Sequence, residues 1–141
     1  MAQPYAPILQ QMMQEFQGQR LESAERLARS ILRINSKDLV ALQVQGLCMA
    51  MQGRVAESVD PFIKAAALDS KNPELLNNLA KAQHGANLFA DAISTYERLN
   101  RLIPNNAQLL TDMGTSYAKK KDFDRAFALY DRAIEIGRAH V

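Results

Sequence analysis

The sequence holds one cysteine and no tryptophan, and only six glycines and five prolines among its 141 residues. A lone cysteine, Cys48, excludes a disulfide within the chain and a zinc cluster built on cysteines. So few turn-forming residues argue against an all-β protein, which needs many tight turns. No apolar run approaches the ~20 residues of a membrane-spanning helix, and no signal peptide is recognisable. We therefore expect a helical protein of the cytoplasm.

Charges of the two signs nearly cancel, because 17 Lys and Arg against 15 Asp and Glu leave a net charge of +2. This balance lacks the basic excess of a nucleic-acid binder and the acidic run of a disordered tail. Apolar residues make up 48% of the chain and charged residues 23%, as in folded globular proteins. We expect a single domain over residues 1–141, with neither a nucleic acid nor a membrane as partner.

The sequence repeats itself every 34 residues. Four units follow one another without insertion, over residues 5–38, 39–72, 73–106 and 107–140. Apolar or aromatic residues fill the same position of each unit, as in the columns Ile34, Leu68, Leu102 and Ile136; Ile8, Leu42, Leu76 and Leu110; and Ala28, Phe62, Tyr96 and Tyr130.

Each unit has the spacing of two amphipathic helices joined by a short turn. Asp38, Asn72 and Asn106 stand where the first helix of the next unit needs an N-cap. The turn within a unit calls for a residue in the left-handed conformation, and we expect this residue to be Gly18, Gly53 or Asn87.

Two positions inside the predicted helices carry residues that helices disfavour. Gly46 and Gly114 share one column with Ala80, which indicates that a small residue is needed where two helices touch. Pro61 lies inside the second helix of the second repeat, residues 39–72. Either Asp60-Pro61 starts that helix, or the helix begins near Val55 and kinks at the proline. We favour the start near Val55.

The 34-residue pattern resembles the tetratricopeptide repeat (TPR). The fourth unit carries the resemblance at Met113-Gly114, Tyr117, Phe123, Ala126, Tyr130 and Ala133, and the third at Leu79-Ala80, Phe89, Ala92, Tyr96 and Pro104. The second unit matches at Gly46, Ser58, Phe62 and Ala65, and the first is the most divergent. The resemblance implies an all-α fold, a right-handed α-α superhelix (a TPR solenoid) of about eight antiparallel helices.

In this family the first helix of each unit lines a concave groove that holds a partner segment. The resemblance therefore implies a protein–protein interaction module, a scaffold that binds a protein or peptide. Stepping by three or four residues along each first helix gives a stripe whose first half is apolar and whose second half is polar. The candidate groove residues are Leu9, Met13, Phe16, Gln43, Leu47, Met51, Asn77, Asn78, Lys81, His84, Thr111, Asp112, Thr115 and Lys119.

The stripe continues at Glu74 in the third unit and at Gln108 in the fourth. We expect its apolar half, Leu9 to Met51, to form an exposed contact patch, the alternative being that Met13 and Phe16 face the core. Some members of the family bind acidic chaperone tails through a clamp of Lys, Arg and Asn. Of the clamp positions only Asn78 carries the family's residue, and Asp112 would repel a carboxylate, so chaperone C-terminal tails are not expected partners.

No residue pattern indicates an enzyme, a cofactor or a metal site. Cys48 falls in a helix interior, where a free cysteine usually acts as a small buried hydrophobe. The two imidazoles, His84 and His140, lack a ligand partner at helical spacing. Lys119-Lys120-Lys121 could hold a phosphate, but Asp122 and Asp124 follow at once, so we interpret the run as a solvated turn.

Two other functions stay open at this stage. The chain could be the N-terminal repeat region of a larger bacterial enzyme such as a glycosyltransferase, or a scaffold that self-associates. Self-association would use the apolar half of the groove or the C-terminal end, where no capping helix follows Ile136. Gly137-Arg138-Ala139-His140 resembles a turn between repeats, so we expect the last helix to end near Ile136 and the chain to be a fragment of a longer protein.

Overall fold

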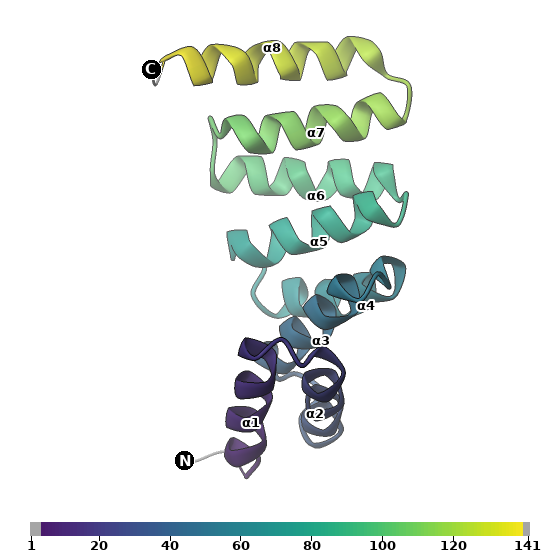
Figure 1. Ribbon diagram of the computed structural model, residues 1–141. Helices are drawn as coiled ribbons and strands as arrows, with labels where there is room; N and C mark the ends of the chain where they lie inside the picture. Colours follow the sequence, from purple (N-terminus) through teal and green to yellow (C-terminus); the bar gives the residue numbers. More distant parts are fainter. Residues whose placement is uncertain (1–3, 140–141) are drawn as a thin grey trace. The chain divides into compact units, whose positions relative to one another are not determined.

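The computed structural model describes residues 4–139 (Figure 1). These residues form eight α-helices and no strand, as the sequence predicts. The helices are α1 (Ala6–Gln17), α2 (Leu21–Ile34), α3 (Leu39–Met51), α4 (Val55–Leu68), α5 (Pro73–Gly85), α6 (Phe89–Leu102), α7 (Ala107–Lys119) and α8 (Phe123–Ala139). Each 34-residue unit thus supplies one antiparallel helix pair.

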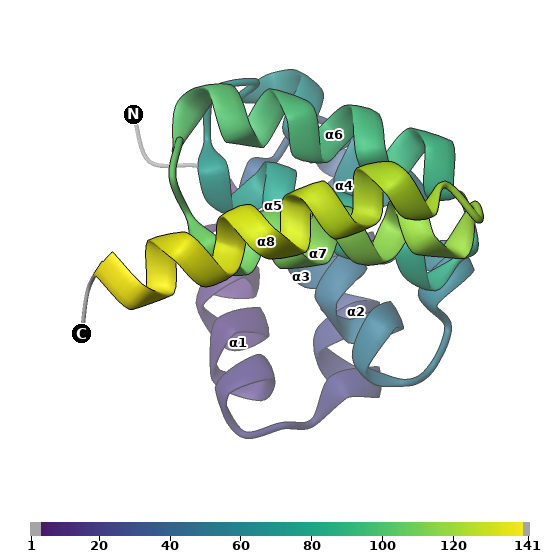
Figure 2. The same ribbon diagram turned by 90° about the horizontal axis from the view of Figure 1, so that it is seen from above.

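The chain divides after Ser70 into two compact units. Unit 1 contains α1 to α4, and its helices pack in chain order, with α1 also touching α3. Unit 2 contains α5 to α8, which stack one upon the next with alternating direction (Figures 1 and 2). Within each unit, every helix therefore packs against its neighbours in the chain.

Three first helices begin at the N-caps that the sequence predicts. The side-chain oxygens of Asp38, Asn72 and Asn106 accept hydrogen bonds from the backbone amides of Ala41, Glu74 and Leu109, at 2.9, 3.0 and 3.0 Å. Each bond satisfies an amide that has no partner inside its helix.

Helix α1 starts without a side-chain N-cap. Tyr5 precedes α1 and is buried, and its hydroxyl donates a 2.7 Å hydrogen bond to Oδ2 of Asp38 while it accepts one of 2.9 Å from Nδ2 of Asn35. Asp38 therefore caps α3 with one carboxylate oxygen and anchors the start of α1 with the other. Nothing in the repeat pattern indicated this role for Tyr5.

The turns inside the helix pairs all contain one left-handed residue. Gly53 (φ 86°) and Asn87 (φ 65°) hold this position, as predicted, and Lys121 (φ 66°) holds it in the last pair. In the first pair the prediction of Gly18 is wrong, because Gly18 has φ −79° and Gln19 takes the left-handed conformation with φ 59°. The reason is the 34-residue frame, in which residue 19, not residue 18, shares the column of Gly53.

Each of these turns closes with a backbone hydrogen bond that spans six residues. The amide of Arg20 donates to the carbonyl of Glu15 at 2.9 Å, and the amide of Asp122 donates to the carbonyl of Tyr117 at 3.0 Å. This is the Schellman arrangement, which imposes the left-handed conformation whatever the residue. The three lysines at 119–121 are exposed and end α7 in such a turn, as interpreted from the sequence.

The small-residue column lies where the two helices of a pair cross. A Cβ added to Gly46 would lie 2.6 Å from Cε1 of Phe62, and one added to Gly114 would lie 2.7 Å from Cε1 of Tyr130. In the first pair the sizes are reversed, because the buried residues of the same two columns are Met12 and Ala28. The expectation of a close helix contact at Gly46 and Gly114 is confirmed.

The sequence left two starts open for α4 and predicted an earlier end for α8. Helix α4 begins at Val55 and contains Pro61, which confirms the early start. Helix α8 does not end near Ile136 but continues through Gly137 and Arg138 to Ala139, so the expected turn is wrong for these residues, and His140 lies outside the described part. A single helical glycine costs only ~1 kcal/mol, too little to stop a helix. The last turn of α8 extends past the start of α7 (Figures 1 and 2).

Unit 1 also contains a buried carboxylate, Glu25 on α2, whose side chain is 4% exposed. It accepts hydrogen bonds from Arg29 at 2.7 Å, from Nε2 of Gln52 at 2.9 Å and from Arg54. Burial opposes its ionisation, but the bonds from Arg54 and Gln52 and the charges of Arg54 and Arg29 outweigh burial and lower its pKa. Glu25 thus joins α2 to the turn between α3 and α4.

Candidate binding groove

Unit 2 has a pocket of about 300 Å³ between its two first helices, α5 and α7. Asn72 and Asn106 cap these helices and fix where each begins, so the side chains one and two turns further along point the same way. The pocket is lined by Pro73, Glu74, Asn77, Lys81, Leu99, Ile103, Asn106, Gln108, Leu109 and Asp112.

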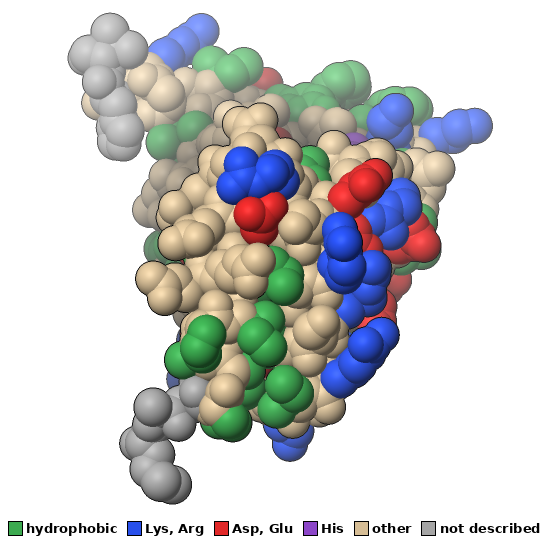
Figure 3. All heavy atoms as spheres, turned by 60° about the horizontal axis from the view of Figure 1, so that its bottom comes forward, with side chains coloured by type: hydrophobic (Ala, Val, Ile, Leu, Met, Phe, Trp, Pro, Cys, Tyr) green, Lys and Arg blue, Asp and Glu red, His purple; other side chains and the backbone are tan. Residues whose placement is uncertain are grey.

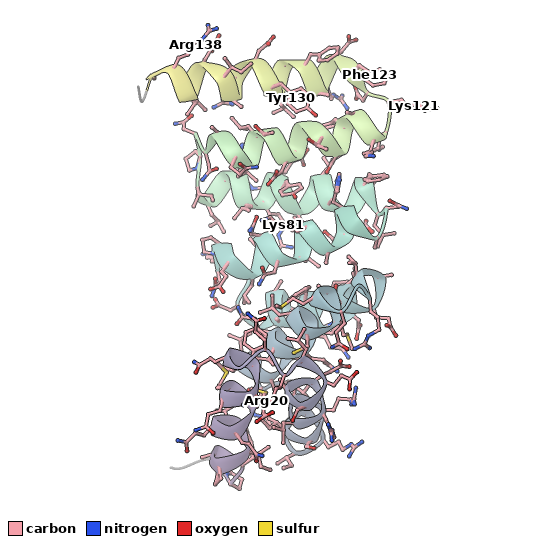
Figure 4. The ribbon with its side chains drawn as sticks, in the orientation of Figure 1. Arg20, Lys81, Lys121, Phe123, Tyr130 and Arg138 are labelled. Atoms are coloured by element: carbon pink, nitrogen blue, oxygen red, sulfur yellow. The ribbon has the colours of Figure 1, made fainter. Side chains whose placement is uncertain are left out.

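Five residues of the predicted stripe meet in this pocket, namely Glu74, Asn77, Lys81, Gln108 and Asp112. Figure 4 labels Lys81 on α5, and its side chain is exposed. The stripe reasoning therefore brings together residues from two helices that are about one repeat apart in sequence. It missed the apolar part of the wall.

That apolar part comes from Leu99 and Ile103 near the end of α6 and from Leu109 on α7. Leu99 and Leu109 are buried, at 1% and 3% exposure, so they form a floor. No signal in the first helices could have found Leu99 and Ile103. The turn residues Pro104-Asn105, which place the end of α6 next to α7, are the only hint in the sequence.

The α7 side of the groove is polar and internally bonded. Nε2 of Gln108 donates to Oδ1 of Asp112 at 2.9 Å, which holds the carboxylate one turn further along the same helix. The hydroxyls of Thr111 and Thr115 each donate to the backbone carbonyl four residues earlier, at 2.9 Å. Thr115 also lies 3.1 Å from the hydroxyl of Tyr130, whose ring reaches from α8 toward α7 (Figure 4).

His84 bridges the two first helices of unit 2. Its Nδ1 lies 2.9 Å from the hydroxyl of Ser116 on α7, and its ring meets the edge of Phe89 at 5.1 Å between centroids. Burial and the charge of Lys119 lower its pKa, and the opposing charge of Asp112 does not offset them. His84 is therefore neutral at pH 7 and acts as a hydrogen-bonding link.

Other predicted groove residues lie on the same helices outside the pocket. Asn78 and Thr111 are half-buried, and Lys119 is exposed at the end of α7. A second hollow of about 400 Å³ opens beside Thr111, between the start of α7 and the second half of α8. It is lined by Ala107, Gln108, Thr111, Tyr130, Ala133 and Ile134.

The apolar stripe in unit 1 is less exposed than expected. Leu9, Met13 and Phe16 are half-buried and pack partly against the unit 1 core. Leu47 and Gln43 on α3 are half-buried too, whereas Met51 is 56% exposed. On the face that Figure 3 brings forward, hydrophobic side chains gather on one side and charged side chains of both signs on the other. The contact role of the stripe stays a prediction.

The one candidate nucleophile is inaccessible. Cys48 is fully buried in α3, and burial raises the pKa of its thiol to about 11, so the reactive thiolate is not formed at neutral pH. In residues 4–139 no three side chains of the His, Cys, Asp and Glu types are gathered as a metal site would need. None of the helices in that part of the chain has the length and apolarity to span a bilayer.

Fold and pocket together define a helical-repeat protein whose unit 2 has a pocket between the first helices α5 and α7. Residues 107–140 match the family model described as a tetratricopeptide repeat. The match covers the fourth 34-residue repeat, and the eight-helix fold agrees with the solenoid that the sequence pattern indicated.

Solved structures of MamA share this fold. MamA of strain MSR-1 superposes with a TM-score of 0.86 at 16% identity, over 95% of this chain and 77% of that one. MamA of strain AMB-1 gives 0.87 at 18% identity, over 93% and 72%. MamA from residue 41 onward of Desulfovibrio magneticus RS-1 gives 0.84 at 14% identity, over 94% and 75%. No curated protein sequence gives a significant match.

Proposed function

We propose that this chain is a protein–protein interaction module and that unit 2 binds an extended segment of a partner along α5 and α7. The observation that carries the proposal is the pocket of about 300 Å³ in which five residues of the predicted stripe meet. Its wall offers amides and charges at the rim and aliphatic carbon at the floor, the combination found in peptide-binding sites.

The carboxamides of the pocket wall suit a peptide backbone. Asn77, Asn106 and Gln108 line the pocket, and each carries a carboxamide with both donor and acceptor atoms. An extended peptide presents unpaired N–H and C=O groups at regular intervals, which such carboxamides can pair. We also propose that the chain acts as a scaffold in the cytoplasm and not as part of an enzyme.

The test is a selection of random twelve-residue peptides displayed on phage against the folded chain. Selected peptides are then synthesised, and their Kd values are measured by fluorescence anisotropy. Lys81→Ala removes a charged group from the pocket wall, and Lys120→Ala, in the exposed turn after α7, is its matched control. A change in Kd with Lys81→Ala that Lys120→Ala does not reproduce supports the groove. Failure to select any peptide, or equal effects of the two variants, overturns it.

Self-association is a second candidate, supported by the outer face of α8. Phe127 is 60% exposed and Ile134 is 52% exposed, whereas Ile93, in the column of Phe127 one repeat earlier, is 7% exposed. An apolar helix face of this kind favours a covering helix. If a second copy supplies it, Phe127→Glu converts a concentration-dependent dimer to a monomer in light scattering. A wild-type chain that is monomeric at all concentrations contradicts this candidate.

A further inference from the structure

The charges that line the α5–α7 pocket are unequal. Glu74 and Asp112 contribute two carboxylates and Lys81 one ammonium group, so the wall carries one net negative charge. Asp112 is fixed in place, because its Oδ1 accepts the hydrogen bond from Gln108. Its charge is felt by the groups around it, since it acts with burial to raise the pKa of Tyr96.

The floor of the pocket suits the stem of a long side chain. Leu99 and Leu109 are buried, and Ile103 and Pro73 complete an aliphatic lining. Lysine and arginine side chains lay their methylene groups along such surfaces and keep the charged head at the polar rim. A short anionic side chain would fill the space less well and would meet two like charges.

We infer that the α5–α7 pocket takes a basic side chain, a lysine or an arginine, of the bound partner, with Asp112 as its counter-ion. Glu74 adds attraction from the other helix, and Lys81 sets the position of the cation by repelling it from its own end of the pocket. This inference rests on the proposed function, because it names the chemistry of the segment that the groove binds. It also predicts that a terminal carboxylate is a poor ligand here.

The experiment uses single capped amino acids as probes, so that it does not depend on a selected peptide. N-acetyl-arginine methylamide, its lysine analogue and its glutamate analogue are titrated into the ¹⁵N-labelled chain at millimolar concentrations. Backbone amide shifts in α5 and α7 report binding at the pocket. We expect the arginine and lysine probes to bind several-fold more tightly than the glutamate probe, in a salt-dependent manner. A stronger arginine signal would indicate bidentate pairing with Asp112.

Two charge changes with opposite expected signs separate charge recognition from a structural effect. Asp112→Asn keeps an oxygen for the hydrogen bond from Gln108 but removes the charge, and we expect it to weaken binding of the basic probes roughly two- to fivefold. Lys81→Met removes the repulsion, and we expect it to tighten the same binding. Asp131→Asn, an exposed carboxylate on α8 outside the pocket, is the matched control and leaves binding unchanged.

Equal affinity for the basic and acidic probes overturns the inference, as does a preference that Asp112→Asn leaves intact. Binding of none of the probes also overturns it. The proposed function fails by a different result, namely the absence of any peptide in the display selection. A groove that selects peptides without basic residues therefore keeps the proposed function and refutes this inference.

Discussion

Replacement of Gly46 by alanine tests whether the crossing of α3 and α4 is limited by a single side-chain contact. Inside a helix, alanine is favoured over glycine by ~1 kcal/mol, so the change would stabilise an unconstrained site. Here the new Cβ would lie 2.6 Å from the ring of Phe62, which is 2% exposed and cannot swing into solvent. Overpacking of this kind costs ~1–3 kcal/mol.

The two effects together give an expected net destabilisation of about 1 kcal/mol for Gly46→Ala. The free energy of unfolding is measured by urea titration followed by helical circular dichroism, with the m-value checking that the same surface unfolds. Gly137→Ala is the matched control, because a Cβ there meets nothing within 4 Å, and we expect it to be neutral or slightly stabilising. Gly114→Ala should cost less than Gly46→Ala, since Tyr130 is only half-buried and can yield.

A double-mutant cycle with Phe62→Leu isolates the contact. Phe62→Leu alone leaves a cavity and is destabilising, but the smaller side chain makes room for the added methyl group. We expect the double variant to be more stable than the sum of the single changes by about 1 kcal/mol. If Gly46→Ala is as favourable as Gly137→Ala and the cycle shows no coupling, the reasoning about this column is refuted.

Three further outcomes follow from the structure. Tyr5→Phe removes the hydroxyl that bonds Asp38 and should cost about 1 kcal/mol of stability, measured by urea titration, whereas an unchanged value would show that the ring alone anchors α1. Glu25 has a lowered pKa, so its stabilising charge is fully present above about pH 5 and is lost as the pH falls through the folded-state pKa. The free energy of unfolding of Glu25→Gln, measured from pH 7 to pH 3, should therefore depend less on pH than that of the wild type. Identical slopes would contradict the pairing of Glu25 with Arg54. Lys121→Gly should raise the thermal midpoint, because glycine adopts φ 66° without strain, and a lower midpoint would contradict this.

Local signals in the sequence were enough for the helices and for the polar residues that line the α5–α7 pocket. The 34-residue period, the N-caps at Asp38, Asn72 and Asn106 and the glycine column can each be found by comparing positions along the chain, without knowing which helices touch. Because a regular helix repeats every 3.6 residues, the positions that share a face of α5 or α7 follow from counting alone. The polar residues of the α5–α7 pocket were therefore predictable.

What the sequence could not supply were the features that depend on a neighbouring helix. Leu99 and Ile103 enter the pocket wall only because α6 ends beside α7, and Glu25 is buried only because Arg54 and Gln52 reach it from another helix pair. At the turns within each helix pair, backbone geometry also overrides the preference of the residue. The Schellman hydrogen bonds require a left-handed residue at one fixed position, so Gln19 and Lys121 adopt it although neither side chain favours it. Residue type sets the local preference, and packing between helices decides where that preference is overruled.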